Sequence, residues 1–185
     1  MDDLQAIRRL KNGDIGGLEI LIARYQEQAV HTAYLVTHHE PMAEDVVQDT
    51  FVRFYENIHN FDETRDFKPY FLRSVVNAAL NAIEKVNREV LLNEDLDVPA
   101  LESLLARAAS VEEQMEYSQL KREVSQALEK LSPRQRAVVV QRYYLEMSEK
   151  EMTEILDVAP GTVKWLLNAA RSRLRSLLAS ERNVE

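Results

Sequence analysis

The sequence contains no cysteine among its 185 residues, and it has little glycine (4) or proline (5). The lack of cysteine excludes a disulfide scaffold, a thiolate zinc site and a cysteine nucleophile. The scarcity of glycine and proline argues against sandwiches, barrels and parallel α/β sheets, because those folds need frequent turns. No apolar run approaches the ~20 residues of a membrane span, and the acidic N-terminus does not resemble a signal peptide. We therefore expect a cytoplasmic, all-α protein without membrane insertion.

Acidic side chains outnumber basic ones by 31 to 23, and the net charge of −8 is unevenly distributed. The net charge is −5 over residues 1–90, −6 over residues 91–118 and +3 over residues 119–185. The negative net charge of the whole chain disfavours a protein that binds nucleic acid unaided, whereas the C-terminal third is basic enough to contact DNA. This asymmetry indicates parts with different partners.

Apolar periodicity predicts two helical domains joined by an acidic linker. The expected bounds are residues 1–88, 89–117 and 118–185. In the first domain we expect a turn at Asn12-Gly13-Asp14 and a break at His38-His39-Glu40-Pro41, since these residues stop helices. The expected helices of that domain cover about 3–11, 14–37 and 42–58, and a fourth begins near Pro69.

The C-terminal domain carries two capping boxes, each with a serine followed three residues later by glutamine or glutamate. Ser132-Pro133-Arg134-Gln135 predicts a helix that runs to about Leu145, and Ser148-Glu149-Lys150-Glu151 predicts a short helix that ends at Leu156. Asp157-Val158-Ala159 then forms a turn before a helix over 160–180. A short helix, a three-residue turn and a longer basic helix are typical of a helix-turn-helix. The second helix of such a motif enters the major groove of DNA, so the sequence predicts DNA binding.

Two other segments have functional and structural interpretations. The polar loop and aromatic residues from Asn60 to Phe71 could stack on unpaired bases, although each ring, taken singly, fits a helical core better. The polar side of the third helix could dock a basic partner, or it could simply face water.

Catalytic and metal-binding motifs are weak. A di-iron bundle needs two Glu-x-x-His units, and the sequence has one, Glu56-x-x-His59. We expect no catalytic residue, metal or cofactor.

Three segments together carry a family resemblance: EDVVQDTFVRFYENIHNF, then FKPYFLRSVVNAAL, then LSPRQRAVVVQRYYLEMSEKEMTEILDVAPGTVKWLLNAARSRLR. In this order they resemble the two modules of bacterial sigma factors, and the short layout resembles the extracytoplasmic-function (ECF) group of the sigma-70 family. The resemblance implies a subunit that directs core RNA polymerase to promoters and helps to open them. It implies as partners the β′ clamp helices and β flap of the polymerase, promoter DNA and an anti-sigma factor.

The resemblance also assigns candidate site residues. Those for the polymerase are Asp45, Gln48, Asp49, Val52 and Arg53. Those for the −10 element are Asn60, Phe61, Thr64, Arg65, Lys68, Tyr70, Phe71, Arg73 and Asn77. Those for the −35 element are Arg134, Arg136, Thr162, Lys164, Trp165, Asn168 and Arg171.

Several residues depart from the family pattern. Trp165 and Leu166 stand where serine and arginine are usual, and Asp157 replaces a turn glycine. The −10 loop is acidic, which weakens its attraction to DNA. The family's two promoter elements lie ~70–85 Å apart at ~3.4 Å per base pair, a span that the linker could bridge. The alternative function is a helix-turn-helix repressor or adaptor that binds duplex DNA without polymerase.

Overall fold

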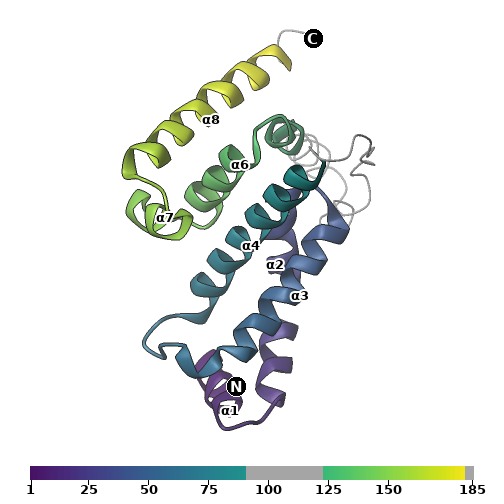
Figure 1. The fold of residues 1–185 in the computed structure, drawn as a ribbon, viewed down its shortest axis with the longest axis vertical. Coiled ribbons are helices and arrows are strands. Elements are labelled where there is room, and N and C mark those ends of the chain that lie inside the picture. Colours follow the sequence, from purple (N-terminus) through teal and green to yellow (C-terminus); the bar gives the residue numbers. More distant parts are fainter. Residues whose placement is uncertain (91–122, 182–185) are drawn as a thin grey trace, which may run out of the picture.

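Figure 1 shows the computed structural model of the chain, which describes residues 1–90 and 123–181. We call these ranges the N-terminal module and the C-terminal module. The acidic linker expected at 89–117 falls outside the described residues, except for its first two positions. The N-terminal module consists of α1 (Asp3–Lys11), α2 (Gly16–Thr37), α3 (Glu40–Glu56), the 3₁₀ turn η1 (Ile58–Asn60) and α4 (Phe67–Val90). The C-terminal module has helical residues 123–129, α6 (Pro133–Val139), the π-helical turn η2 (Val140–Tyr144), α7 (Glu149–Leu156) and α8 (Pro160–Glu181).

Short-range hydrogen bonds set the helix ends of the N-terminal module. The Asp14 side chain accepts from the amide of Gly16 at 2.9 Å, so the expected turn precedes α2. His38 ends α2 in the left-handed conformation (φ 50°), and His39 Nδ1 then accepts from the amide of Met42 at 3.1 Å to begin α3. The break expected at these two histidines is confirmed. Gly17 lets α1 and α2 cross closely, because a Cβ there would lie 2.2 Å from the carbonyl oxygen of Ala6.

In the C-terminal module, the predicted helix starts and the predicted turn are found. Both capping boxes form, with Ser132 and Ser148 each accepting an amide hydrogen from the residue three positions on. Asp157 takes the left-handed turn (φ 48°) between α7 and α8, a conformation that aspartate adopts more readily than most residues. The helix expected to reach Leu145 is instead divided, because η2 changes to π-helical hydrogen bonding at Val140.

The two modules share one apolar core. Ala137 and Val140 of the C-terminal module are 0% and 2% exposed, and both belong to the cluster built from α1 to α4. Figure 1 shows α6 and α7 lying along α4, with α8 on the outer side of the C-terminal module. The helix-turn-helix is thereby held against the N-terminal module.

Candidate nucleic-acid and partner interfaces

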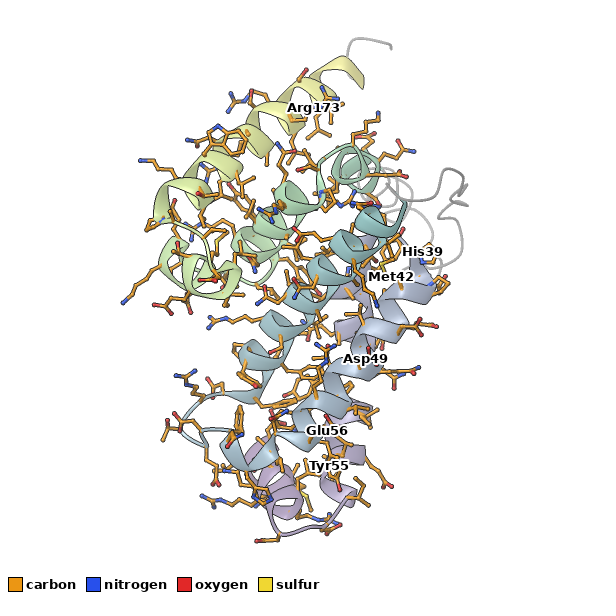
Figure 2. All side chains as sticks on the ribbon, in the orientation of Figure 1. His39, Met42, Asp49, Tyr55, Glu56 and Arg173 are labelled. Atoms are coloured by element: carbon orange, nitrogen blue, oxygen red, sulfur yellow. The ribbon has the colours of Figure 1, made fainter. Side chains whose placement is uncertain are left out.

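The outer face of α3 presents the five residues that the sequence predicts as a docking surface. Val46, Val47 and Thr50 point into the core and are at most 6% exposed, which turns the opposite side of the helix to solvent. Figure 2 shows Asp49 and Glu56 along α3, on the side of the N-terminal module away from α7 and α8. The structure therefore brings together Asp45, Gln48, Asp49, Val52 and Arg53 on one accessible face.

Val52 is notable on this face, because 53% of this apolar side chain is exposed among charged neighbours. An exposed apolar residue within a polar rim is a common feature of protein interfaces. This arrangement suits a protein partner better than a face that meets only water.

The loop before α4 exposes its polar residues and buries most of its rings. Asn60, Thr64, Arg65 and Lys68 are exposed, and Tyr70 is 37% exposed. Lys68 and Tyr70 belong to the first turn of α4, and the other three residues lie in η1 and the loop that precede this helix.

Phe61 and Phe71, which are predicted to contact bases, are both buried in this structure. Phe71 is fully buried, with its ring centroid 4.2 Å from that of Phe51, and Phe61 packs at 5.6 Å on Phe54. Phe67 is also buried, 4.9 Å from Phe54. These rings form an aromatic core under the loop, because burying them stabilises the junction of α3 and α4 more than exposure would. Periodicity alone could not separate core rings from stacking rings.

Cations on α1 compensate part of the loop's negative charge. Glu63 pairs with Arg8 at 2.9 Å and with Lys11 at 3.1 Å, and these two hydrogen-bonding cations lower the pKa of its carboxyl group. Lys11 also donates to the carbonyl oxygen of Phe61 at 2.8 Å, which fixes the loop on α1. Sequence reasoning missed Arg8 and Lys11, because they lie about 50 residues before the loop that they hold.

Arg73 and Asn77 face the C-terminal module. The guanidinium of Arg73 forms a salt bridge with the Glu151 carboxylate, and Asn77 Nδ2 donates to the carbonyl oxygen of Ile155 at 2.9 Å. Both acceptors belong to α7, the first helix of the helix-turn-helix. An open cavity of about 230 Å³ continues this seam between Leu80 of α4 and Leu166 of α8.

Arg136, which is predicted to contact DNA, is directed into the protein in this structure. Arg136 is 8% exposed, and its Nε donates to the carbonyl oxygen of Val36 at 2.8 Å. Its Nη1 donates to the carbonyl oxygens of Glu129 and Leu131. Burial lowers the pKa of this guanidinium. Arg134 is more exposed, but its Nε donates to Glu84 of α4 at 2.8 Å. Both arginines thus connect the two modules. The sequence shows that these residues are charged, but it does not show which partner the charge meets.

The remaining candidates for the −35 element lie on the accessible side of α8. Val163, Leu166, Leu167 and Ala170 are at most 6% exposed and fix this helix on its own module. The opposite side carries the five candidate residues, of which Thr162 is half-buried and the others are exposed: Thr162, Lys164, Trp165, Asn168 and Arg171. Trp165, with 65% of its side chain exposed, stands between the small residues Gly161 and Ala169.

Tyr143 of η2 is a partner of this surface that the sequence did not indicate. Its hydroxyl oxygen accepts from Arg171 Nε at 2.6 Å, and the Arg171 guanidinium lies 5.8 Å from the centre of its ring. The contact orients Arg171 on the surface of α8 while leaving its terminal amino groups for other acceptors. Arg173 lies farther along the same helix (Figure 2).

Two further properties concern residues 1–90 and 123–181 only. Within these ranges no three His, Asp or Glu side chains are grouped so that they could bind a metal ion. The same ranges contain no helix with the length and apolar character that crossing a membrane requires.

Comparison with known proteins identifies both modules. Residues 21–89 match Sigma-70 region 2, and residues 121–174 match Sigma-70, region 4. Among curated relatives, the ECF RNA polymerase sigma factor SigW of Bacillus subtilis is 29% identical over 178 residues, which cover 93% of this chain and 94% of SigW. The ECF RNA polymerase sigma-E factor of Haemophilus influenzae is 26% identical over 182 residues, 95% of each chain.

Solved structures share the fold. The sigma factor RpoE from Bartonella quintana, in complex with the anti-sigma factor NepR, superposes with a TM-score of 0.66 at 22% identity. That match covers 87% of this chain and 96% of the other. CnrH in complex with the cytosolic domain of CnrY superposes with a TM-score of 0.60 at 23% identity and covers 96% and 97% of the two chains.

Proposed function

The chain belongs to the ECF group of the sigma-70 family, and from this premise we propose how its surfaces divide the work of promoter recognition. It is an RNA polymerase sigma factor that directs core polymerase to promoters. As in the family, it acts as a non-enzymatic initiation factor, and its place of action is the cytoplasm. The observation that carries this function is the presence of both sigma regions, in order, in one all-helical chain.

The outer face of α3 binds core polymerase in this proposal. Three features support it: the five residues are exposed together, Val52 supplies an apolar centre, and Asp45 and Asp49 supply negative charge. A face of this composition is complementary to a partner helix that carries basic residues around an apolar stripe. The β′ clamp helices are the expected partner.

The loop and first turns of α4 read the −10 element. Tyr70 is the ring that supports stacking on an extruded base, and Arg65 and Lys68 supply cations for phosphates. Arg73 and Asn77 extend this surface along α4 once their contacts with α7 are released. The compensation of Glu63 by Arg8 and Lys11 lessens the repulsion of DNA that the loop's composition suggests.

The accessible side of α8 reads the −35 element in the major groove. Lys164 and Arg171 provide phosphate contacts, whereas Trp165 and Asn168 lie where the first turns of a recognition helix meet base edges. The β flap and an anti-sigma factor are proposed as further protein partners. The relatives in complex with NepR and CnrY support the second of these.

Reconstituted transcription tests this function. The purified chain is combined with bacterial core polymerase, the bound genomic DNA is sequenced, and the recovered promoters are transcribed in vitro. We expect specific initiation that core polymerase alone does not give. A chain that does not associate with core polymerase, yet binds duplex DNA tightly in a gel shift, would instead be an autonomous repressor or adaptor.

A further inference from the structure

Two adjacent tyrosines of η2 have different neighbours. The Tyr143 hydroxyl oxygen accepts from Nε of Arg171 on α8 at 2.6 Å, whereas the ring of Tyr144 lies 5.8 Å from the ring of His31 on α2. Successive residues of a helix point in directions about 100° apart, so one side chain of the pair meets α8 while the next meets α2. Tyr143 is thereby a part of the α8 surface, although it belongs to another element.

The contact between Tyr143 and Arg171 leaves donors of both side chains accessible. Tyr143 is 56% exposed, and Arg171 is exposed as well. A phenol that accepts through its oxygen keeps its own O–H group to donate, and a guanidinium bonded at Nε keeps both terminal amino groups. These donors belong to side chains in direct contact at the surface, so they lie within reach of one ligand.

The charge of Arg171 is not neutralised within the chain that the structure describes. Arg8, Arg9 and Arg134 each bind a carboxylate through Nε, whereas the Nε partner of Arg171 is an uncharged phenol. Its guanidinium lies 5.8 Å from the centre of the Tyr143 ring, where the ring attracts a cation without cancelling its charge. The pair therefore has a net positive charge, and its ligand should be an anion with several acceptor oxygens.

The position of Arg171 along α8 indicates which anion this is. Lys164, Asn168 and Arg171 share one face of the helix, because they are spaced by four and three residues. At 1.5 Å per residue, Arg171 lies about 10 Å beyond Lys164 along the helix axis. The major groove is about 12 Å wide. A helix that enters the groove at its first turns therefore brings Arg171 to the edge of the groove, where the phosphates lie.

We propose that Tyr143 and Arg171 form a joint site for one phosphate group beside the −35 element, so that Tyr143 is itself a contact of DNA. The proposal rests on the proposed function, because it takes the accessible side of α8 as the −35 surface. The terminal amino groups of Arg171 bind the phosphate oxygens by charge-assisted hydrogen bonds, and the Tyr143 O–H group donates to the same phosphate. Because Tyr143 already holds Arg171 at Nε, less side-chain freedom is lost when DNA binds.

A methylphosphonate scan of the DNA tests this site. A methylphosphonate removes the charge and one acceptor oxygen of a single phosphate and leaves the bases unchanged. The full chain is assembled with core polymerase, and its affinity is measured for duplexes of a recovered promoter that carry one such substitution at a time around the −35 element. Tyr143→Phe removes the hydroxyl group and keeps the ring. Tyr144→Phe is the matched control, because it makes the same change at the next residue of η2.

We expect one phosphate at which the methylphosphonate weakens binding about threefold to tenfold for the parent chain and for Tyr144→Phe. Tyr143→Phe should bind the unmodified duplex about threefold less tightly than the parent, and the methylphosphonate at this phosphate should then cost less than half of the parent's factor. Arg171→Ala should be insensitive to the same substitution. A parent profile without such a phosphate, or equal sensitivity of Tyr143→Phe and the parent at it, would overturn the joint site.

Two further outcomes have separate meanings. If Tyr143→Phe binds core polymerase more weakly than the parent when no DNA is present, the pair contacts a protein surface and the joint phosphate site is wrong. If the parent chain gives core polymerase no preference for the recovered promoters, the proposed function fails, and the joint site fails with it. Specific initiation together with an unchanged methylphosphonate profile in Tyr143→Phe would overturn the joint site alone.

Discussion

Arg136 donates from Nε to the carbonyl oxygen of Val36, 100 residues earlier in the chain, and so caps the C-terminus of α2. The last turn of α2 has no basic residue of its own. The last carbonyl oxygens of a helix lack intrahelical partners and carry partial negative charge, so a guanidinium there satisfies both needs. A helix end in the N-terminal module is thus completed by the C-terminal module.

Arg136→Met should destabilise this arrangement by about 2–3 kcal/mol, because it removes the guanidinium donor from three carbonyl oxygens, and two of these hydrogen bonds are buried. Urea unfolding of the full chain measures the change. Arg134→Met is the control, since the side chain of Arg134 is 59% exposed and a surface pair with Glu84 contributes at most about 1 kcal/mol. Equal losses in both variants would contradict the capping role of Arg136.

Asp49→Ala and Lys164→Ala should affect different steps: the first should weaken binding to core polymerase, and the second should weaken promoter-dependent transcription. The first removes a charge from the α3 face, so its affinity for core polymerase should fall about threefold to tenfold. The second removes a cation from α8, so promoter-dependent transcription should fall and its log–log salt slope should decrease by about 0.9. Binding to core polymerase and transcription from a recovered promoter are measured for both. The surface assignment is wrong if each variant behaves as the parent chain in both assays.

Trp165 should make the −35 contact sensitive to thymine methyl groups. An indole that projects between two small residues can pack on the methyl in the major groove, and each buried methyl contributes about 0.8 kcal/mol, or about fourfold in affinity. Replacing thymine by uracil at single −35 positions should therefore weaken the polymerase complex at one or more positions. Trp165→Ala should bind less tightly and respond equally to thymine and uracil there. Indifference of the parent chain to uracil at every position would exclude this contact.

His38 should make stability depend on pH. Burial and the nearby Arg136 charge lower the pKa of its imidazole from 6.5 to about 4. Between these two values the unfolded chain binds the proton and the folded chain does not, so stability falls as the pH falls through that window. The expected loss from this group between pH 7.5 and pH 5 is about 2 kcal/mol.

His38→Asn isolates this contribution. Asparagine tolerates the left-handed backbone at this position (φ 50°) and does not titrate. Between pH 7.5 and pH 5 the free energy of unfolding in urea should fall by about 2 kcal/mol less for this variant than for the parent chain. If the free energy of unfolding depends on pH in the same way for both proteins, the folded state does not lower the pKa of the His38 imidazole.

Helix ends were the most predictable part of the fold, because their causes lie within a few residues. Ser132 with Gln135 and Ser148 with Glu151 form capping boxes at the expected positions. Asp157 accepts the left-handed turn expected for it. In each case the hydrogen-bonding partners are three or four positions apart, so the sequence itself displays them.

Contacts between distant segments could not be predicted in this way. An arginine in a basic helical segment has the same appearance whether it meets DNA or, like Arg136, a carbonyl oxygen of another helix. The periodicity of α6 shows that Ala137 and Val140 face a core, but it does not show that the core belongs to the other module. The rings of Phe61 and Phe71 were ambiguous for the same reason, since aromatic side chains suit a core and a base stack equally.

The burial of Ala137 and Val140 in a core built by α1 to α4 has a consequence for the lifetime of the protein in the cell. A chain that separates its modules before meeting polymerase uncovers an apolar patch on each half, and such patches promote self-association and attack by proteases. A molecule whose modules stay together keeps these patches covered and avoids both self-association and proteolysis. We therefore expect copies that keep their modules together to survive longer than copies that open before they bind polymerase.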